Sequence, residues 1–340
     1  MSIGVAIIGS GIFVKEEHLP AVNSTPSLSL KAVFSRSLKS AASLDIQDPG
    51  VDLYSEDAGE GKAYADLLAR KDVSAVIIAL PIVAQPDFVK QALTAGKHVL
   101  AEKPIAKDVQ TAEALIAHSE GCRSGATLSI AENFRFLESL NYAAEAVRGM
   151  GEVTGFSVRK HGFVKPGTKY FETAWRKTPD YQGGFLLDGG VHTVAAIRLL
   201  LQPENQPMSV SAFSSLLQPH LPPIDSVDAV WRTGKGKHGV FSMSFGTMSK
   251  ASETVIVTEQ GTVSVTIGAV TVASGDDKRT VEFTHEGNGV KQEMKVWAEG
   301  MLSGKQDSRL SAYEALKDLQ VLEAMFRSGE NDGTPVKIQI

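Results

Sequence analysis

Two short stretches of the 340-residue chain carry side chains that could stabilise charge or move protons. The first reads HVLAEKP, in which an apolar, partly β-branched run leads into Glu102, Lys103 and Pro104. A lysine placed after a strand starts from a fixed backbone, and the following proline limits how that backbone can relax. Its ammonium group could donate a hydrogen bond to a substrate oxygen and stabilise developing negative charge. We predict that Lys103 is catalytic and that Glu102 positions the lysine or contacts a cofactor ribose.

The second stretch, GGFLLDGGVHTVAA, contains Asp188 and His192 four residues apart. On a helix this spacing places both side chains on one face. Histidine titrates near neutrality and can pass a proton, and a carboxylate can orient it. We predict that His192 supplies or accepts a proton, that Asp188 orients it, and that the glycines let backbone and ligand come close. A helix N-terminal aspartate and a hydrogen-bonded structural histidine would fit the same residues.

The start of the chain resembles a dinucleotide-binding turn. IIGSGIFV places Gly9 and Gly11 directly after an apolar run, where the first glycine permits a tight bend and the second lets the backbone approach a pyrophosphate. The third glycine position holds Val14, so the fingerprint is incomplete. We expect the cofactor to contact this turn and the ends of the following strands, through Gly9, Gly11, Ile12, Phe13, Leu80, Pro81, Glu102 and Lys103.

The residues after the second predicted strand favour NADP over NAD. Sites specific for NAD place an acidic residue there for the ribose 2′-hydroxyl, but this chain has VFSRSLKS and no acid before Asp45. Ser35, Arg36 and Ser37 could instead bind a 2′-phosphate, since the arginine fork suits phosphate. An ordinary solvated arginine on a loop would also fit.

Alternating apolar runs and helical patterns predict how these residues are positioned. Up to about residue 135 the order is that of βαβ units, which predicts a doubly wound parallel sheet. Beyond it, hairpin signals predict a mainly antiparallel open sheet with helices on one face. The fold class is therefore α/β, with a doubly wound Rossmann domain over residues 1–125 and an α+β domain over residues 126–340. The predicted strands are 3–8, 30–34, 75–80, 98–101 and 127–131, then 151–162, two hairpins in 228–246 and 253–268, and 336–340; the predicted helices are 64–70, 86–95, 108–119, 139–148 and 311–327.

The composition excludes several partner classes. The net charge is -5 and no basic tract is present, which argues against a nucleic-acid surface. No apolar run approaches the ~20 residues of a membrane span, and the N-terminus lacks the plan of a signal peptide. Cys122 is the only cysteine, which fits a reducing compartment, so we expect a cytoplasmic protein. We expect no metal site, and we interpret His18, His98 and His161 as structural.

The ordered set of motifs closely resembles the Gfo/Idh/MocA family of oxidoreductases. Its parts are the glycine turn, GIFVKEEHLPAV, EKP, AENFRF, WRKTP, GGFLLDGGVH and the closing SAYEALKDLQVLEAMFRSGENDGTPVKI. The overall pattern resembles a fungal-type NADP-dependent branch. The resemblance implies NAD or NADP as hydride carrier and dimers or tetramers through the C-terminal sheet. It also implies a cis Lys103–Pro104 bond, and Lys103, Asp188 and His192 in a cleft between the domains.

Three positions depart from the family pattern. Val14 replaces the third small residue, Gln85 lies where many members have a histidine, and Ala195 occupies the place of an aspartate. The last change removes one possible partner of His192.

We therefore predict an NADP(H)-dependent oxidoreductase that acts on a sugar, polyol or small carbonyl compound. Asn133, Arg135, Trp175 and Arg176 could line the pocket, although ordinary packing would also explain them. One alternative is a non-enzymatic NADP-sensing regulatory protein of the same fold. Another is a redox-assisted lyase or glycosidase, in which the hydride returns to the product. Net consumption of NADPH separates the first hypothesis from the other two.

Overall fold

The computed structural model describes residues 2–339, which form two compact units. The first unit runs to Glu132 and also includes Val290–Leu316, and the second comprises Asn133–Gly289 and the chain from Lys317 onward. These units differ from the predicted domains, residues 1–125 and 126–340, chiefly because the late segment Val290–Leu316 belongs to the first unit.

A six-stranded parallel sheet forms the centre of the first unit, in the order β3-β2-β1-β4-β5-β6. This is the doubly wound Rossmann arrangement that the sequence predicted. The prediction missed β3, a four-residue strand that begins with an aspartate and carries no long apolar run. The strands are β1 (Ile3–Ile8), β2 (Leu28–Ser35), β3 (Asp52–Ser55), β4 (Ala75–Ile78), β5 (His98–Glu102) and β6 (Leu128–Ala131).

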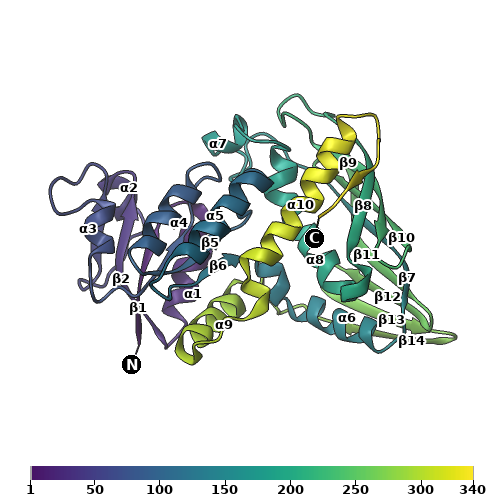
Figure 1. Ribbon diagram of the computed structural model, residues 1–340, viewed down its shortest axis with the longest axis horizontal. Coiled ribbons are helices and arrows are strands. Elements are labelled where there is room, and N and C mark those ends of the chain that lie inside the picture. Colours follow the sequence, from purple (N-terminus) through teal and green to yellow (C-terminus); the bar gives the residue numbers. More distant parts are fainter. Residues whose placement is uncertain (1, 340) are drawn as a thin grey trace. The chain divides into compact units, whose positions relative to one another are not determined.

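Helices cover both faces of this sheet. Helices α4 and α5 pack against each other, and α9 packs against α1 and β6 (Figure 1). Asp108 caps α5, because its side chain accepts a hydrogen bond from Thr111 N at 2.7 Å. The helices are η1 (Val14–His18), α1 (Leu19–Asn23), α2 (Leu38–Ala42), α3 (Tyr64–Leu68), α4 (Gln85–Thr94), α5 (Val109–Gly121), α9 (Val290–Ser303), η4 (Ser308–Leu310) and the start of α10 (Ala312–Gly329).

The second unit is built on a nine-stranded sheet in the order β14-β13-β12-β11-β7-β10-β9-β8-β15. The sheet is mainly antiparallel, as predicted, and β7 and β10 form its parallel pair. Both predicted hairpins are present as β9–β10 and β11–β12. The strands are β7 (Val153–Phe163), β8 (Pro207–Ser215), β9 (Ser226–Thr233), β10 (His238–Ser244), β11 (Gly246–Thr258), β12 (Gly261–Thr266), β13 (Ala269–Ser274), β14 (Asp277–Glu282) and β15 (Val336–Lys337). The predicted last strand included Ile340, which lies outside the described residues.

One face of this sheet forms the core beneath the helices. Trp231 and Phe241 are buried there and stack with ring centroids 4.9 Å apart. Figure 1 shows α6, α8 and the C-terminal part of α10 on this side of the strands. The opposite face carries exposed side chains at alternate positions, as the period of a strand requires. The helices of this unit are η2 (Asn133–Phe136), α6 (Glu138–Arg148), α7 (Ala174–Lys177), α8 (Phe185–Leu200), η3 (Pro203–Asn205) and the rest of α10.

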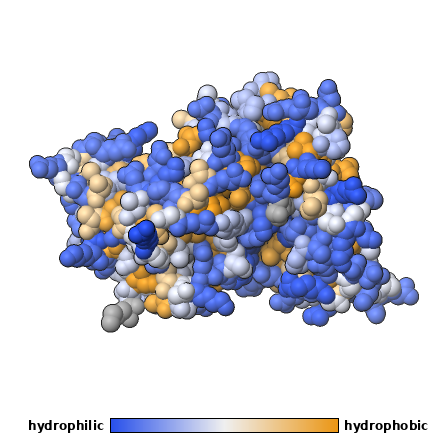
Figure 2. Space-filling model, in the orientation of Figure 1, coloured by the Kyte–Doolittle hydropathy of each residue, from blue (hydrophilic) through white to orange (hydrophobic). Residues whose placement is uncertain are grey.

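Within residues 2–339, no helix is long and apolar enough to cross a membrane. The face of the molecule drawn in Figure 2 is mostly hydrophilic, with apolar side chains scattered over it. The same part of the chain contains no group of three or more His, Cys, Asp or Glu side chains arranged to hold a metal ion.

Candidate active site

The glycine turn after β1 has the geometry that a dinucleotide needs. Gly9 has a φ of +121°, and a Cβ atom there would lie 2.3 Å from the Ala79 carbonyl oxygen, so the position requires glycine. Gly11 is exposed, and a Cβ atom there would meet nothing within 4 Å. Ile12 and Phe13 follow, half-buried, where the helix begins. The open space above Gly11 at a helix start suits a pyrophosphate, so these residues fit the cofactor.

Arg36, directly after β2, is an exposed cation. Ser35 is buried, and its hydroxyl lies 2.7 Å from the Ser10 hydroxyl, which ties the end of β2 to the glycine turn. Ser37 is the N-cap of α2 and accepts a hydrogen bond from Ser40 N at 3.2 Å. Arg36 lies between them and is exposed. The serines thus have local hydrogen bonds, and Arg36 is the most accessible of the three side chains.

The structure adds an acidic residue that the sequence analysis missed. Asp57 accepts hydrogen bonds from Leu38 N at 2.7 Å and from the Ser55 hydroxyl at 2.6 Å. These bonds lower the pKa of the Asp57 carboxyl, so it carries a negative charge at the start of α2. Asp57 follows β3, the strand that was not predicted, and its motif SED gave no other signal. Arg36, Lys39 and Asp57 therefore together set the charge near the end of β2.

Lys103 follows β5, and the residue before it is held by two other elements. Glu102 Oε1 lies 2.7 Å from His18 Nε2, and the Glu102 carbonyl oxygen accepts a hydrogen bond from Gln85 Nε2 at 2.5 Å. Lys103 is half-buried and its peptide bond to Pro104 is cis, as the resemblance implied. Leu80 and Pro81 lie just beyond the end of β4, which is the neighbour of β5. The predicted residues of these two strands therefore meet at one sheet edge.

In the second unit, Arg176 holds Asp188. Asp188 lies in the first turn of α8, is buried, and accepts a hydrogen bond from Arg176 Nε at 2.7 Å. The guanidinium carbon of Arg176 lies 3.9 Å from the centre of the Trp175 ring, which is a cation–π contact. Burial, together with the negative charge of Asp188, raises the pKa of the Tyr181 hydroxyl. Trp175, Arg176 and Asp188 thus form one cluster. Their spacing in the sequence did not predict it.

His192 lies one turn after Asp188 on α8 and is half-buried. Its ring stacks on Phe134 with centroids 4.5 Å apart and an interplanar angle of 17°. The neighbouring Asn133 is buried and donates from Nδ2 to the Asn288 carbonyl oxygen at 2.6 Å. The stack fixes the plane of the imidazole ring, and Asn133 ties the η2 turn to the loop before α9.

The expectation for the glycines of the second motif is wrong at three positions. A Cβ atom would lie 2.8 Å from Phe245 at Gly189, 2.4 Å from Met243 at Gly190 and 2.4 Å from Phe326 at Gly183. The protein's own side chains therefore fill the space above these glycines. Their small size lets α8 pack closely on the sheet and on α10, rather than admitting a ligand.

Arg135, a candidate for the pocket, lies instead in a buried ion-pair cluster. Its guanidinium binds Asp318 Oδ2, and Arg198 Nη1 binds the other carboxylate oxygen at 2.5 Å. All three side chains are buried. This arrangement ties η2, α8 and α10 together and supports the ordinary packing explanation for Arg135.

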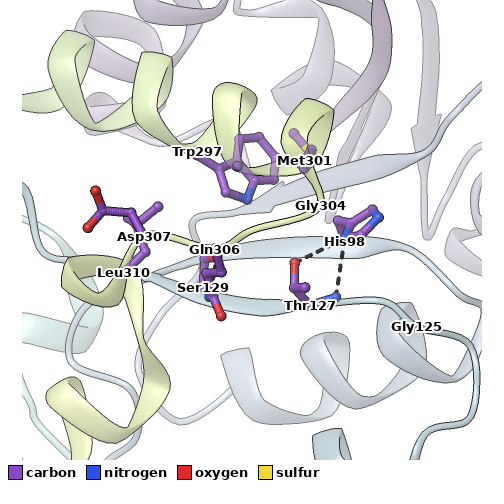
Figure 3. Close-up of a pocket in the computed structure, with 11 residues that line it drawn as sticks. His98, Gly125, Thr127, Ser129, Trp297, Met301, Gly304, Gln306, Asp307 and Leu310 are labelled. Atoms are coloured by element: carbon purple, nitrogen blue, oxygen red, sulfur yellow. Dashed lines mark hydrogen bonds between the residues drawn. The ribbon is translucent and has the colours of Figure 1, made fainter.

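A small cavity of about 90 Å³ lies in the first unit beside the start of β5 (Figure 3), whereas Lys103 follows the end of that strand. It is lined by His98, which begins β5, and by Thr127, Trp297 and Gln306 among others. His98 Nδ1 lies 2.9 Å from the Thr127 hydroxyl, and burial lowers the pKa of this histidine. Ligand sites usually have a volume of roughly 300–1,000 Å³, so the cavity is too small for a dinucleotide or a sugar.

Comparisons with known proteins agree with this geometry. Residues 3–126 match the family model described as "Oxidoreductase family, NAD-binding Rossmann fold", and residues 145–264 match the GFO/IDH/MocA C-terminal domain. Dehydrogenase FPY6 of Fusarium mangiferae is 42% identical over 342 residues, which cover 98% of each chain. A dTDP-3,4-didehydro-2,6-dideoxy-alpha-D-glucose 3-reductase of Actinomadura kijaniata is 32% identical over 205 residues, covering 58% of this chain and 56% of the relative. The solved structure of an oxidoreductase from Thermotoga maritima has a TM-score of 0.87 and 29% identity, covering 99% of this chain and 98% of that chain. The chain therefore belongs to the Gfo/Idh/MocA family of oxidoreductases, whose N-terminal domain is an NAD-binding Rossmann fold.

Proposed function

We propose that the protein is an NADP(H)-dependent oxidoreductase that transfers a hydride to or from a sugar, polyol or small carbonyl compound. The observation that carries the proposal is Lys103, half-buried at the sheet edge on a backbone that His18, Glu102 and Gln85 hold. A nicotinamide dinucleotide, when bound, supplies the hydride. A sensor would not need a cation built into this edge, which is why the regulatory alternative is less well supported.

The roles of the chain's own residues follow from their chemistry. Lys103 donates a hydrogen bond to the substrate oxygen and stabilises negative charge on it. His192 supplies or accepts the proton. Asp188 supports the charged form of the histidine, and Arg176 keeps Asp188 in place. We propose that the cofactor is held by Gly9, Gly11, Ile12, Phe13, Ser35, Arg36, Ser37, Leu80, Pro81, Glu102, Lys103, Asn133, Trp175 and Arg176.

The name of the relative from Actinomadura kijaniata, the 3-reductase of a dTDP-linked didehydro-dideoxyglucose, supports a sugar or related carbonyl substrate. The direct test is a panel of carbonyl compounds with NADPH, and of sugars and polyols with NADP, monitored by absorbance of the reduced nicotinamide. Net oxidation or reduction of the cofactor is expected with at least one member of the panel. Cofactor binding without net turnover across the panel would favour the NADP-sensing alternative, and product formation without net NADPH consumption would favour the lyase or glycosidase.

Replacing Arg36 with alanine should weaken binding of NADP(H) and leave binding of NAD(H) almost unchanged. The arginine can form a charge-assisted hydrogen bond to the 2′-phosphate that NAD lacks, and losing it should cost roughly 1.5–3 kcal/mol. Titration calorimetry with both cofactors measures the difference. Asp57→Asn is the matched control. It removes a negative charge beside the same loop, so it should strengthen binding of NADP(H) relative to binding of NAD(H). Equal weakening of both cofactors in Arg36→Ala would show that this residue does not discriminate.

We also propose a homodimer or tetramer that forms through the outer face of the C-terminal sheet. Val230 on β9 and Val240 on β10 are paired in register on this face, and each is 49% exposed. Adjacent exposed apolar side chains on an uncovered strand face favour association. Val230→Asp should therefore lower the mass measured by sedimentation at micromolar concentration. Ile267→Asp, at an 83% exposed position beyond β12, is the control. An unchanged mass in Val230→Asp would place the interface elsewhere.

The domain division at residues 125 and 126 and a cytoplasmic location also stay proposals. The first is supported by the family models, which end at residue 126 and resume at residue 145. The second is supported by the single cysteine, Cys122, because disulfides are rare in reducing compartments.

A further inference from the structure

We propose that His18 is a positioning residue for Lys103 and acts through Glu102. The inference rests on the catalytic role proposed for Lys103. His18 Nε2 lies 2.7 Å from Glu102 Oε1, and Lys103 N donates to Glu102 Oε2 at 3.2 Å. Each carboxylate oxygen thus accepts from one partner. The carboxylate links a histidine of the first helix to the backbone from which the lysine side chain starts.

Packing alone does not explain a histidine at position 18. The side chain is completely buried, and within residues 2–339 its Nδ1 atom has no hydrogen-bond partner. Leaving a buried polar atom unsatisfied is costly, so an apolar residue would be more stable in a purely structural role. Because Nδ1 has no acceptor, the favoured tautomer carries its proton on Nε2 and donates to Glu102. The Phe13 ring packs against the imidazole in a T-shaped arrangement, with ring centroids 5.2 Å apart, and holds it in this orientation.

The backbone that carries His18 has an unusual form. Val14–His18 is a π-helical segment in which Leu19 N bonds to Val14 O, and it continues directly into α1. Pro20 explains the widening, because it has no N–H and its ring would clash with the carbonyl four residues earlier in an α-helix. Single π-turns inside helices occur frequently at functional sites. Val14, at the third glycine position of the fingerprint, is buried at the start of this same segment.

Gln85 holds Glu102 from a third element. It is buried in the first turn of α4 and donates from Nε2 to the Glu102 carbonyl oxygen at 2.5 Å. The side chain of Glu102 is therefore fixed by η1 and its carbonyl group by α4. Since that carbonyl belongs to the peptide unit of Lys103, the two contacts together fix the plane from which the lysine stem departs.

The test compares His18→Leu, which deletes the donor, with His18→Gln, whose amide nitrogen can take the place of Nε2. The first readout is hydrogen exchange of the Lys103 amide in the full-length protein, and it needs no substrate. His18→Leu should accelerate this exchange by about tenfold, because Glu102 loses the partner that fixes it. His18→Gln should restore protection. With a substrate in hand, His18→Leu should lower kcat by up to about 10²-fold at nearly unchanged KM, as expected for a misplaced group.

Val22→Ala is the matched control. Val22 is buried in α1, the continuation of the same helix, and its aliphatic side chain cannot hydrogen-bond Glu102. This variant should lower Tm without changing Lys103 exchange or kcat. Unchanged exchange of the Lys103 amide in His18→Leu, or failure of His18→Gln to restore it, overturns the proposal.

Glu102→Gln provides a second test in case His18→Leu does not fold. His18 and Lys103 N bond to different oxygens of Glu102, and an amide replaces one of these oxygens with an NH₂ group that cannot accept, so one of the two contacts is lost. Faster exchange of the Lys103 amide supports the proposal, and wild-type exchange overturns it. Absence of any turnover in the wild-type protein would contradict the proposed function, while the exchange experiments would still decide the role of His18.

Discussion

Lys103→Met is expected to cut turnover by about 10²–10⁴-fold, because the variant loses the ammonium group that stabilises negative charge on the substrate oxygen. Methionine keeps the length of the side chain and deletes its charge, so the substitution separates chemistry from packing. The variant should fold like the wild type and bind NADPH with an affinity within a few-fold of the wild-type value, because β5 and the contacts of Glu102 remain. The measurement is steady-state turnover on a substrate found in the carbonyl and polyol panel, with NADPH affinity determined separately by titration.

Two variants make this result specific. Lys107→Met removes an exposed lysine of the same loop and should turn over like the wild type. His192→Asn should lose less activity than Lys103→Met, because Ala195 is buried where family members carry an aspartate that could support the histidine. Turnover near the wild-type level in Lys103→Met would assign the lysine to the scaffold.

Most of the fold could be predicted because its signals are local. Buried parallel strands such as β1 and β4 are continuous apolar runs, and hairpins such as β9–β10 carry glycine turns. The strand β3 is as short as β4, but its sequence DLYS contains no continuous apolar run. Helix α9 was overlooked although Val290, Met294 and Trp297 have helical spacing and are all buried.

The candidate site could be predicted only where a motif fixes its own geometry. The positive φ of Gly9 and the place of Lys103 at a strand end follow from the local sequence. The bond between Asp57 and Leu38 does not, because the strand β3 brings these residues together. The expectation that the glycines of the second motif admit a ligand was wrong for a similar reason. Only the fold shows that Met243 fills the space above Gly190.

The buried cluster around Asp318 predicts the largest loss of stability. Asp318 binds Arg135 and Arg198 with one carboxylate oxygen each, and none of the three side chains is open to solvent. Asp318→Asn keeps the shape but removes the negative charge that balances the two guanidinium groups. Breaking a buried ion pair by neutralising one partner costs about 3–5 kcal/mol, so the free energy of unfolding measured in urea should fall by that amount.

Glu299→Gln is the matched control for Asp318→Asn, because it breaks an exposed i,i+4 pair with Lys295. Exposed pairs of this kind contribute little, so the urea midpoint of this variant should stay close to that of the wild type. The contrast between the two carboxylates tests burial rather than charge as the cause of the loss. A fall of less than about 1 kcal/mol in Asp318→Asn would mean that the two arginines find other compensation, since exposed pairs already reach that value. In that case the packing explanation for Arg135 would lose its support, and a role of this residue in ligand binding would have to be tested.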